Sequence, residues 1–494
     1  MSQVHQVMQH CRKTFTALSF DDITLRDQYS TVGPESVSVA THVTKTIKLK
    51  TPIMSAAMDT VTEAGLALAL AKAGGIGIIH RNLSAAEQAQ QVDWVRKQVH
   101  HRGMVSKPVT FLVTDTVSTI ETAVQIYGYS FTSFPIVDKD GKLCGLISRD
   151  QMDFVRAGEN PMLCTVMNKT PMSISEHSTL DDAENLMYTH NVKKLPIVDS
   201  SNTLKGMYVW KDLFEDRSMY SLDKEGHFLV GAAVGVLTPQ EKERVDMLVK
   251  VGCKVIVIDC SHGACDAALD MLRYIKTTDC QAIVGNVASA EACSKLVRGG
   301  ILPDAIKVGI GPGSICTTRQ VTGHGVPQVT AVHEVWTVAN SLNIPIIVDG
   351  GIRCSGDMVK AFAVGANAVM LGSMLAAATE SPGDVIQGKY KKIRGMGSRE
   401  AMSEREGSRK RYFKDMGSAL LTQKQSQKLT PEGVVGMVEH RGSVRSIVDE
   451  ICGGIKAGLA HSGACNILEF QKKVEMWIQT PAGVIEGRPH SINQ

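Results

Sequence analysis

This chain of 494 residues has few aromatic side chains and little net charge. Phe, Trp and Tyr together make up 5% of it, and 53 basic residues against 50 acidic ones leave a net charge of +3. A nucleic-acid-binding surface needs concentrated positive charge and, for single strands, aromatic platforms on which bases stack. The composition therefore argues against an obligatory nucleic-acid partner.

Long hydrophobic runs are also missing, so no segment is expected to cross a membrane. The best candidate, residues 64–79, is interrupted by Lys72 and by Gly74-Gly75. The N-terminus lacks the contiguous apolar core of a signal peptide, and residues 490–494 match no common retention or peroxisomal signal. We expect a cytoplasmic protein, with an organelle left open.

Paired cysteines are absent as well. None of the 12 cysteines forms a CxxC pair, and their spacing from Cys11 to Cys465 does not suit a zinc site. In a reducing compartment most of them are expected to be small buried residues. Cys316 is the exception, because it lies in a polar, glycine-rich segment.

Short apolar runs that end in or near Gly, Ser, Asp or Asn are what the chain does contain. The eight runs are 52–57, 75–79, 228–234, 254–259, 282–286, 305–309, 345–349 and 368–372. Continuous Val/Ile-rich runs are typical of strands buried on both faces, and helix-like stretches separate them (240–251, 289–298, 332–342, 356–364). The alternation predicts an α/β fold, a (β/α)₈ TIM barrel. The rival, a doubly wound open sheet, lacks its GxGxxG fingerprint after the first strand.

The spacing of the runs breaks once, between residues 79 and 228, and an internal repeat fills part of the gap. Pro135 and Pro196 are 61 residues apart, as are Gly145 and Gly206. The repeat resembles two tandem CBS motifs (a Bateman domain), a module that commonly binds purine nucleotides, although a structural pair without a ligand is the alternative. We expect a barrel of residues 1–103 and 222–494 with a regulatory domain of about 104–221 inserted.

The segment 307–319 follows a predicted barrel strand and therefore lies on the catalytic rim. Gly309, Gly311 and Gly313 let the backbone approach a ligand, and Ser314 can donate to a phosphate. Cys316 lies in this exposed turn, where backbone donors and polar neighbours can activate a thiol. We interpret Cys316 as a nucleophile.

Four other strand ends carry polar groups suited to a nucleotide. Asp349, followed by Gly350-Gly351, and Asp259 can each accept from two ribose hydroxyls, and Asn286 can bind a sugar or base. Gly372-Ser373 follows the last strand, where this architecture usually binds phosphate. Each Asp alone could equally cap a helix. Two diol-binding acids suggest two nucleosides, a substrate and a dinucleotide.

The chain resembles the IMP dehydrogenase / GMP reductase family over nearly its whole length. The most specific motifs are those of residues 309–328 (GIGPGSICTTRQVTGHGVPQ), 54–63 (MSAAMDTVTE) and 349–356 (DGGIRCSG). The resemblance implies that Cys316 bonds covalently to purine C2. It implies a substrate site of Met58, Asn286, Ser314, Asp349, Gly351, Gly372, Ser373, Met396 and Gly397, and a nicotinamide-cofactor site of Asp259, Ser261 and Gly309.

The resemblance also implies a monovalent cation, K⁺, and an oligomer. Gly311, Gly313 and the Cys316 carbonyl would bind the cation together with Glu486 and Gly487 of a neighbouring subunit. Members of the family are typically homotetramers that can pair into octamers.

Two reactions are compatible with this site. The dehydrogenase oxidises IMP to XMP with NAD and needs a base for the hydrolysis step. The resemblance assigns this base to Arg411 and Tyr412, on a mobile flap of about residues 393–433. Thr318 and Glu432 could supply a second proton route. The reductase converts GMP to IMP and ammonia with NADPH.

Departures from the dehydrogenase pattern at Ile393, Arg399 and Glu400 keep the reductase open, with Glu400 as an acid for the departing ammonia. A nucleotide-sensing protein without activity is the third hypothesis, which the intact Cys316 and flap disfavour.

Overall fold

The computed structural model describes residues 3–98, 100–101, 104–106, 108–127, 133–156, 158–214, 217–404 and 430–489. Two compact units divide the chain, one of residues 1–96 and 219–494 and the other of residues 97–218. Within the described ranges, every helix is too short or too polar to span a bilayer.

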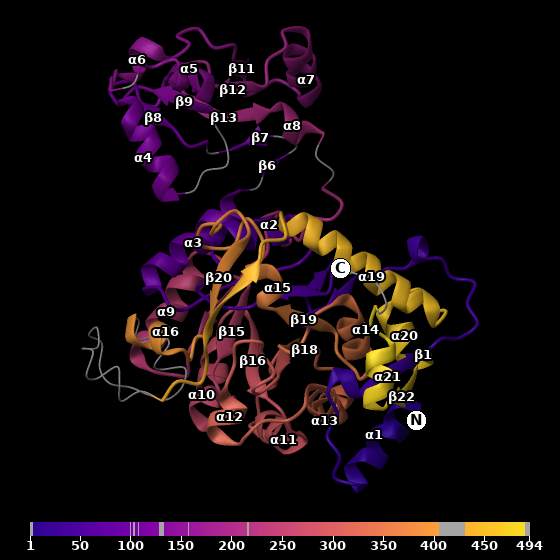
Figure 1. The fold of residues 1–494 in the computed structure, drawn as a ribbon. Coiled ribbons are helices and arrows are strands. Elements are labelled where there is room, and N and C mark those ends of the chain that lie inside the picture. The colour runs from indigo at the N-terminus through magenta and orange to yellow at the C-terminus, as the bar shows by residue number, and fades with distance from the viewer. Residues whose placement is uncertain are drawn as a thin grey trace. The chain divides into compact units, whose positions relative to one another are not determined.

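The first unit is built on a parallel barrel of eight strands, which confirms the predicted fold class (Figure 1). Around the barrel the strands are β4 (Ile53–Ser55), β5 (Gly77–Ile79), β14 (Val230–Val234), β15 (Val255–Asp259), β16 (Gln281–Val287), β17 (Ala305–Val308), β18 (Ile346–Asp349) and β19 (Ala368–Leu371). A parallel bridge between Met54 and Ile76 joins the two ends of this sheet. Each strand coincides with one of the eight predicted runs.

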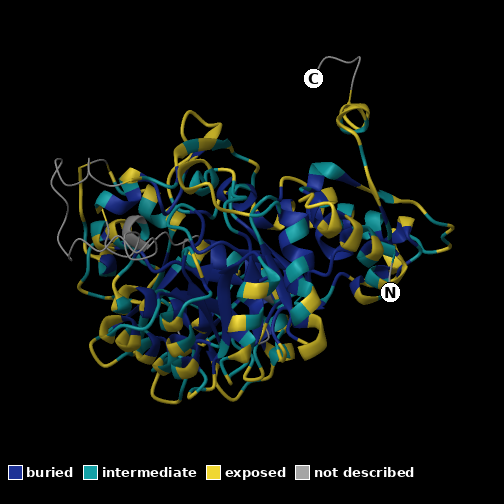
Figure 2. Cartoon of the chain, turned by 90° about the horizontal axis from the view of Figure 1, so that it is seen from below, coloured by how far each residue is buried: buried dark blue, intermediate teal, exposed yellow. Residues whose placement is uncertain are grey.

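Helices surround the barrel and cover its strands, whose residues are buried except for Gln281 and Asp349; buried residues are dark blue in Figure 2. The covering helices are α2 (Ala64–Lys72), α3 (Ala85–Lys97), α9 (Pro239–Lys250), α10 (Asp266–Ile275), α11 (Ala290–Arg298), α13 (Gln328–Ala339), α14 (Ser355–Ala363) and α19 (Val444–His461). Aliphatic side chains from the barrel strands, such as Val257, Ile283 and Ile347, fill the interior. The barrel is therefore a packed core, and only its loops are available for chemistry.

Two segments of the first unit that are far apart in sequence pair with each other. Strand β1 (Ile23–Arg26) pairs antiparallel with β22 (Glu475–Ile478), and α1 (Gln3–Lys13) packs on β22. The remaining elements of this unit are β2 (Thr41–His42), β3 (Lys48–Leu49), α12 (Thr318–Thr322), α15 (Ser373–Ala376), β20 (Tyr390–Arg394), α16 (Arg399–Glu404), β21 (Val435–Glu439), α20 (Ile467–Lys473) and α21 (Pro481–Glu486), with short 3₁₀ turns η1 (Phe20–Asp22), η2 (Pro34–Ser36) and η3 (Asn340–Leu342).

A buried arginine joins the segments that leave and re-enter the barrel around the second unit. Arg96, near the end of α3, donates to Asp223 at 2.8 Å, and its guanidinium lies 3.3 Å from Nδ1 of His227. Arg96 and Asp223 are both largely buried. This contact, which we call the Arg96 clamp, therefore holds residues on the two sides of the insertion together.

The second unit contains two copies of one motif. The first copy has β8 (Phe111–Leu112), α4 (Val117–Tyr127), β9 (Ser133–Val137), β10 (Leu143–Ser148) and α5 (Arg149–Asp153), followed by α6 (Leu163–Val166); the second has β11 (Ile174–Ser175), α7 (Leu180–Thr189), β12 (Lys194–Val198), β13 (Leu204–Val209) and α8 (Trp210–Leu213). The short strands β6 (His100–His101) and β7 (Met104–Val105) extend the second sheet. In each copy the first strand pairs parallel with the middle strand, and the last strand pairs antiparallel with it.

Candidate active site

A cavity of about 300 Å³ lies at the carboxyl ends of the barrel strands, the face where barrel enzymes bind their ligands. The loops after β4, β17, β18 and β19 form its wall, together with residues around η1. Seven of the predicted site residues line it: Met58, Gly313, Ser314, Asp349, Gly351, Gly372 and Ser373. The loops predicted to bind substrate thus meet around one space.

Glycine is required where two of these loops approach each other. Gly309 has a φ of 144°, and a Cβ atom there would lie 2.2 Å from the carbonyl oxygen of Asp349. Gly350 and Gly351 have φ angles of 86° and 79°. Because other residues rarely adopt such angles, glycine lets the backbone after β17 and β18 close in on the cavity.

Cys316, Thr318 and Glu432 form a continuous chain of hydrogen bonds. The Cys316 thiol donates to Oγ1 of Thr318 at 3.3 Å, and the Thr318 hydroxyl donates to Oε2 of Glu432 at 3.1 Å. Backbone bonds fix Glu432 from both sides, since its carbonyl accepts from Thr317 at 3.1 Å and its amide donates to Gly397 at 2.9 Å. Residues 114 positions apart in sequence therefore offer a path along which a proton can move away from the thiol.

Asp259, Asn286 and Asp349 are brought together by a residue that sequence analysis missed. The ammonium of Lys307 donates to Asp259 at 3.0 Å, to Asp349 at 2.6 Å and to the side-chain oxygen of Asn286. The amide of Asn286 in turn donates to Asp349 at 2.9 Å. The sequence did contain a signal for this contact: Lys307 is a single charged residue in an otherwise apolar predicted strand, and a buried lysine requires hydrogen-bond partners.

Gln328 is a second residue that the sequence did not reveal. Its side-chain amide donates to the carbonyls of Val308 and Asp349, both at 3.0 Å, and so ties the loop after β17 to the loop after β18. Gln328 is 3% exposed and lines the cavity. Its position at the start of α13 gave no sign of this contact, which depends on the closed barrel.

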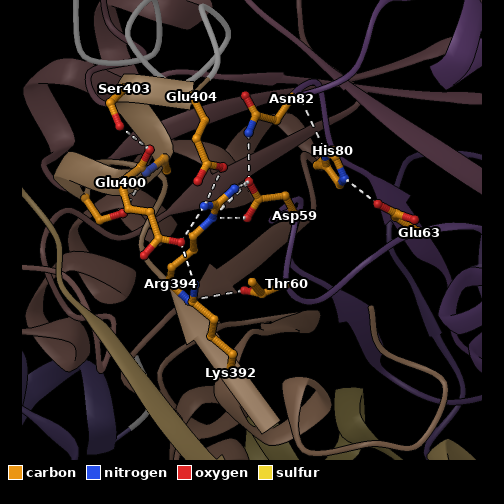
Figure 3. A network of polar contacts seen from close by, with 12 residues as sticks. Asp59, Thr60, Glu63, His80, Asn82, Lys392, Arg394, Glu400, Ser403 and Glu404 are labelled. Atoms are coloured by element: carbon orange, nitrogen blue, oxygen red, sulfur yellow. Dashed lines mark hydrogen bonds and ion pairs between the residues drawn. The ribbon is translucent and has the colours of Figure 1, made fainter. Parts of the chain in front are cut away.

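Glu400, the candidate acid of the reductase hypothesis, lies in a network of ion pairs (Figure 3). Its carboxylate accepts from Lys392 at 2.6 Å and from Arg394 at 2.7 Å. Arg394 also pairs with Asp59 at 2.7 Å and with Glu404 at 2.8 Å. The hydrogen bond from Lys392 and that from Arg394 hold the pKa of Glu400 below its ordinary value, so the group is ionised near neutral pH.

The other predicted residues lie in several places. Met396 and Gly397 are buried beside Glu432, Ile393 lines the cavity, and Ser261 follows β15. Gly311 lies in the loop before Cys316, whereas Glu486 and Gly487 are exposed at the end of α21. Arg411 and Tyr412 lie outside the described residues.

Comparison with known proteins identifies the family of this arrangement. The family model described as "IMP dehydrogenase / GMP reductase domain" matches residues 17–490. The inosine-5'-monophosphate dehydrogenase of Aquifex aeolicus is 43% identical, covering 97% of this chain and 96% of the relative, and that of Bacillus subtilis is 40% identical, covering 96% of each. Among solved structures, GMP reductase from Trypanosoma brucei, a cysteine-to-alanine variant in complex with guanosine 5'-monophosphate, has a TM-score of 0.79 at 32% identity and covers 97% of this chain and 98% of its own. The chain belongs to the IMP dehydrogenase / GMP reductase family.

Proposed function

We propose that the protein is an IMP dehydrogenase, which oxidises IMP to XMP with NAD in guanine nucleotide biosynthesis. The observation that carries the proposal is the chain from Cys316 through Thr318 to Glu432, because a proton route beside the nucleophile suits the hydrolytic half of that reaction. The pairing of Glu400 with two cations supports it further, since an ionised, bound carboxylate is a poor acid for a leaving amine. Full-length relatives that carry the dehydrogenase name agree.

In this mechanism the Cys316 thiolate attacks C2 of the purine after its proton passes to Thr318 and Glu432. NAD supplies the acceptor for the hydride that leaves C2. Water then hydrolyses the thioimidate on Cys316, and Arg411 with Tyr412 would activate that water. Asp349 would accept from the ribose, while Ser314 and Ser373, at the cavity wall, would donate to the phosphate.

The residues present also fit the cofactor and the cation. Asp259, at the end of β15, would accept from the cofactor ribose, with Ser261 in the same loop and Gly309 directly after β17. Backbone carbonyls suit a cation such as K⁺. The carbonyl of Gly313 already accepts from the amide of Cys316 at 3.0 Å, which leaves a second lone pair, and Gly311 and Cys316 would complete the set with Glu486 and Gly487 of a neighbouring subunit.

Regulation and assembly belong to the same proposal. The duplicated unit of residues 97–218 would be a tandem CBS domain that binds purine nucleotides, inserted into a barrel that carries the catalysis. A homotetramer, able to pair into an octamer, would bring Glu486 to a neighbour's loop. The protein would act in the cytoplasm.

An assay at the nicotinamide absorbance band tests the function. We expect IMP with NAD to give XMP and NADH, and no consumption of NADPH with GMP. A signal only with GMP and NADPH would establish the reductase. No signal with either pair, from protein that binds nucleotides, would support the inactive sensor.

GMP reductase is the second candidate, which the likeness to the Trypanosoma brucei structure favours. Glu400→Gln separates the two. We expect it to leave turnover of IMP within a few-fold, because Glu400 balances Lys392 and Arg394 and moves no proton in the dehydrogenase. Steady-state rates for Glu400→Gln beside a matched Glu404→Gln, which pairs with the same Arg394, provide the measurement. A loss of 100-fold or more in the turnover of GMP with NADPH, confined to Glu400→Gln and at the scale of a missing general acid, would support the reductase.

A further inference from the structure

The contacts of Lys307 span four adjacent barrel strands. Lys307 is on β17, Asp259 on β15, Asn286 on β16, and Asp349 on β18. Lys307 is 1% exposed, so its charge has no access to bulk water. An ammonium has three donors, and the three oxygens of Asp259, Asn286 and Asp349 take all of them.

This arrangement makes each acid depend on the same cation. Two carboxylates that share a buried site repel each other, and a buried charge is tolerated only when it is paired. Asp349 lines the cavity, whereas Asp259 does not belong to its wall. Lys307 therefore connects the acid facing the cavity to an acid behind it.

Asn286 makes the arrangement rigid. Its side-chain oxygen accepts from Lys307, and its amide nitrogen donates to Asp349 and, at 2.7 Å, to the carbonyl of Gly309. Oδ2 of Asp349 thus receives two hydrogen bonds, from Lys307 and from Asn286. The orientation of the Asp349 carboxylate is set by groups that the ligand need not touch.

We propose that Lys307 is a positioning residue that couples the site of the substrate nucleotide to the site of the nicotinamide nucleotide. The inference rests on the proposed function, because that function assigns Asp349 to the ribose of one and Asp259 to the ribose of the other. Lys307 neutralises the repulsion between the two acids and orients both, so a change at one acid alters the affinity at the other. Couplings between sites are typically about 5- to 150-fold in affinity.

The Lys307→Met variant removes the ammonium group and keeps an unbranched side chain that is one heavy atom shorter. We expect it to weaken IMP binding by about 5- to 150-fold, the range of such couplings, since Asp349 then faces an unneutralised Asp259. Adding Asp259→Asn removes the repulsion, so the double variant should recover part of the IMP affinity although Asp259 is not in the cavity wall. NAD affinity should stay low in the double variant, because the acid proposed for its ribose is gone.

The IMP affinities are measured by calorimetry, without NAD, on four proteins: the unmodified protein, Lys307→Met, Asp259→Asn and the double variant. Lys391→Met is the matched control: Lys391 is also 1% exposed, but its ammonium donates to backbone carbonyls of Ser381 and Thr379, at 2.6 and 3.3 Å. The control should lose thermal stability without a change in IMP affinity. A purely structural role for Lys307 would lower stability in the same way and give no recovery in the double variant.

Two results would overturn the coupling: IMP affinity within two-fold of the unmodified protein in Lys307→Met, or no recovery on adding Asp259→Asn. If Lys307→Met does not fold, Lys307→Arg, which keeps the charge, takes its place, and Asp259→Asn is introduced into Lys307→Arg and into the unmodified protein. An equal effect of Asp259→Asn on IMP affinity in these two proteins supports the coupling. No effect of Asp259→Asn on IMP affinity contradicts it. If the unmodified protein binds GMP and not IMP, the proposed dehydrogenase function is refuted. The coupling is then tested by measuring the affinities of the same variants for GMP. Binding of neither nucleotide would refute both.

Discussion

Replacement of Cys316 by alanine is expected to abolish turnover while IMP continues to bind. The thiol is the only atom of the proposed site that forms a covalent bond to the purine, and removing a catalytic nucleophile commonly costs on the order of 10⁶-fold in rate. The groups proposed for ribose and phosphate, Asp349, Ser314 and Ser373, line the cavity, whereas Cys316 lies beside its wall, and these groups remain in place. NADH formation and calorimetry with IMP measure the two properties separately.

Cys465→Ala is a suitable control, because Cys465 is exposed and takes no part in the chain of hydrogen bonds from Cys316 through Thr318 to Glu432. Alkylation would not replace the substitution. A hydrogen bond from Cys260 lowers the pKa of Cys265 to about 6, so the Cys265 thiol is ionised near neutral pH and would react with an alkylating reagent. Turnover near the normal rate in Cys316→Ala would refute the covalent mechanism.

Replacement of Arg411 by alanine is expected to spare the hydride step and slow hydrolysis. A general base is worth roughly 10²- to 10⁴-fold in rate, so its loss should let the thioimidate on Cys316 accumulate. Rapid mixing with IMP and NAD should show a fast burst of NADH followed by a steady state reduced by that factor. Arg409→Ala, two residues earlier in the same segment, should retain the normal steady state.

A reduced burst would place Arg411 in the hydride step, contrary to the proposal. Equal rates in Arg411→Ala and the unmodified protein would indicate that the route through Thr318 and Glu432 activates the water by itself. The reductase would also be little affected by Arg411→Ala, and its need for GMP and NADPH distinguishes it.

The barrel could be predicted because each strand is a local pattern. Every run of buried aliphatic residues became a strand, with bounds that differ by a few residues, as in 282–286 against Gln281–Val287. The helix expected at 332–342 begins earlier, at Gln328, because Pro327 occupies its N-cap position. Rim residues such as Asp349 and Ser373 could be predicted for the same reason, since they directly follow strands.

Partners distant in sequence could not be predicted. Arg394 and Asp59 are 335 residues apart and meet only because β20 packs beside the loop after β4. The sequence around Glu400 does not show whether its carboxyl group acts as a general acid or forms ion pairs with two cations. Lys307 did carry a local signal, the single charge in a buried strand, but its three partners are known only from the closed barrel.

The Arg96 clamp has a consequence for how such a gene can change. Arg96 and Asp223 both belong to the barrel unit, so their contact joins the two sides of the insertion without involving residues 97–218. Closing the same gap with a chain of a different length changes the entropy cost by only about 0.6 kcal/mol per doubling. Insertions and deletions within residues 97–218 should therefore cost the barrel little loop entropy, as long as the pair of Arg96 and Asp223 is kept.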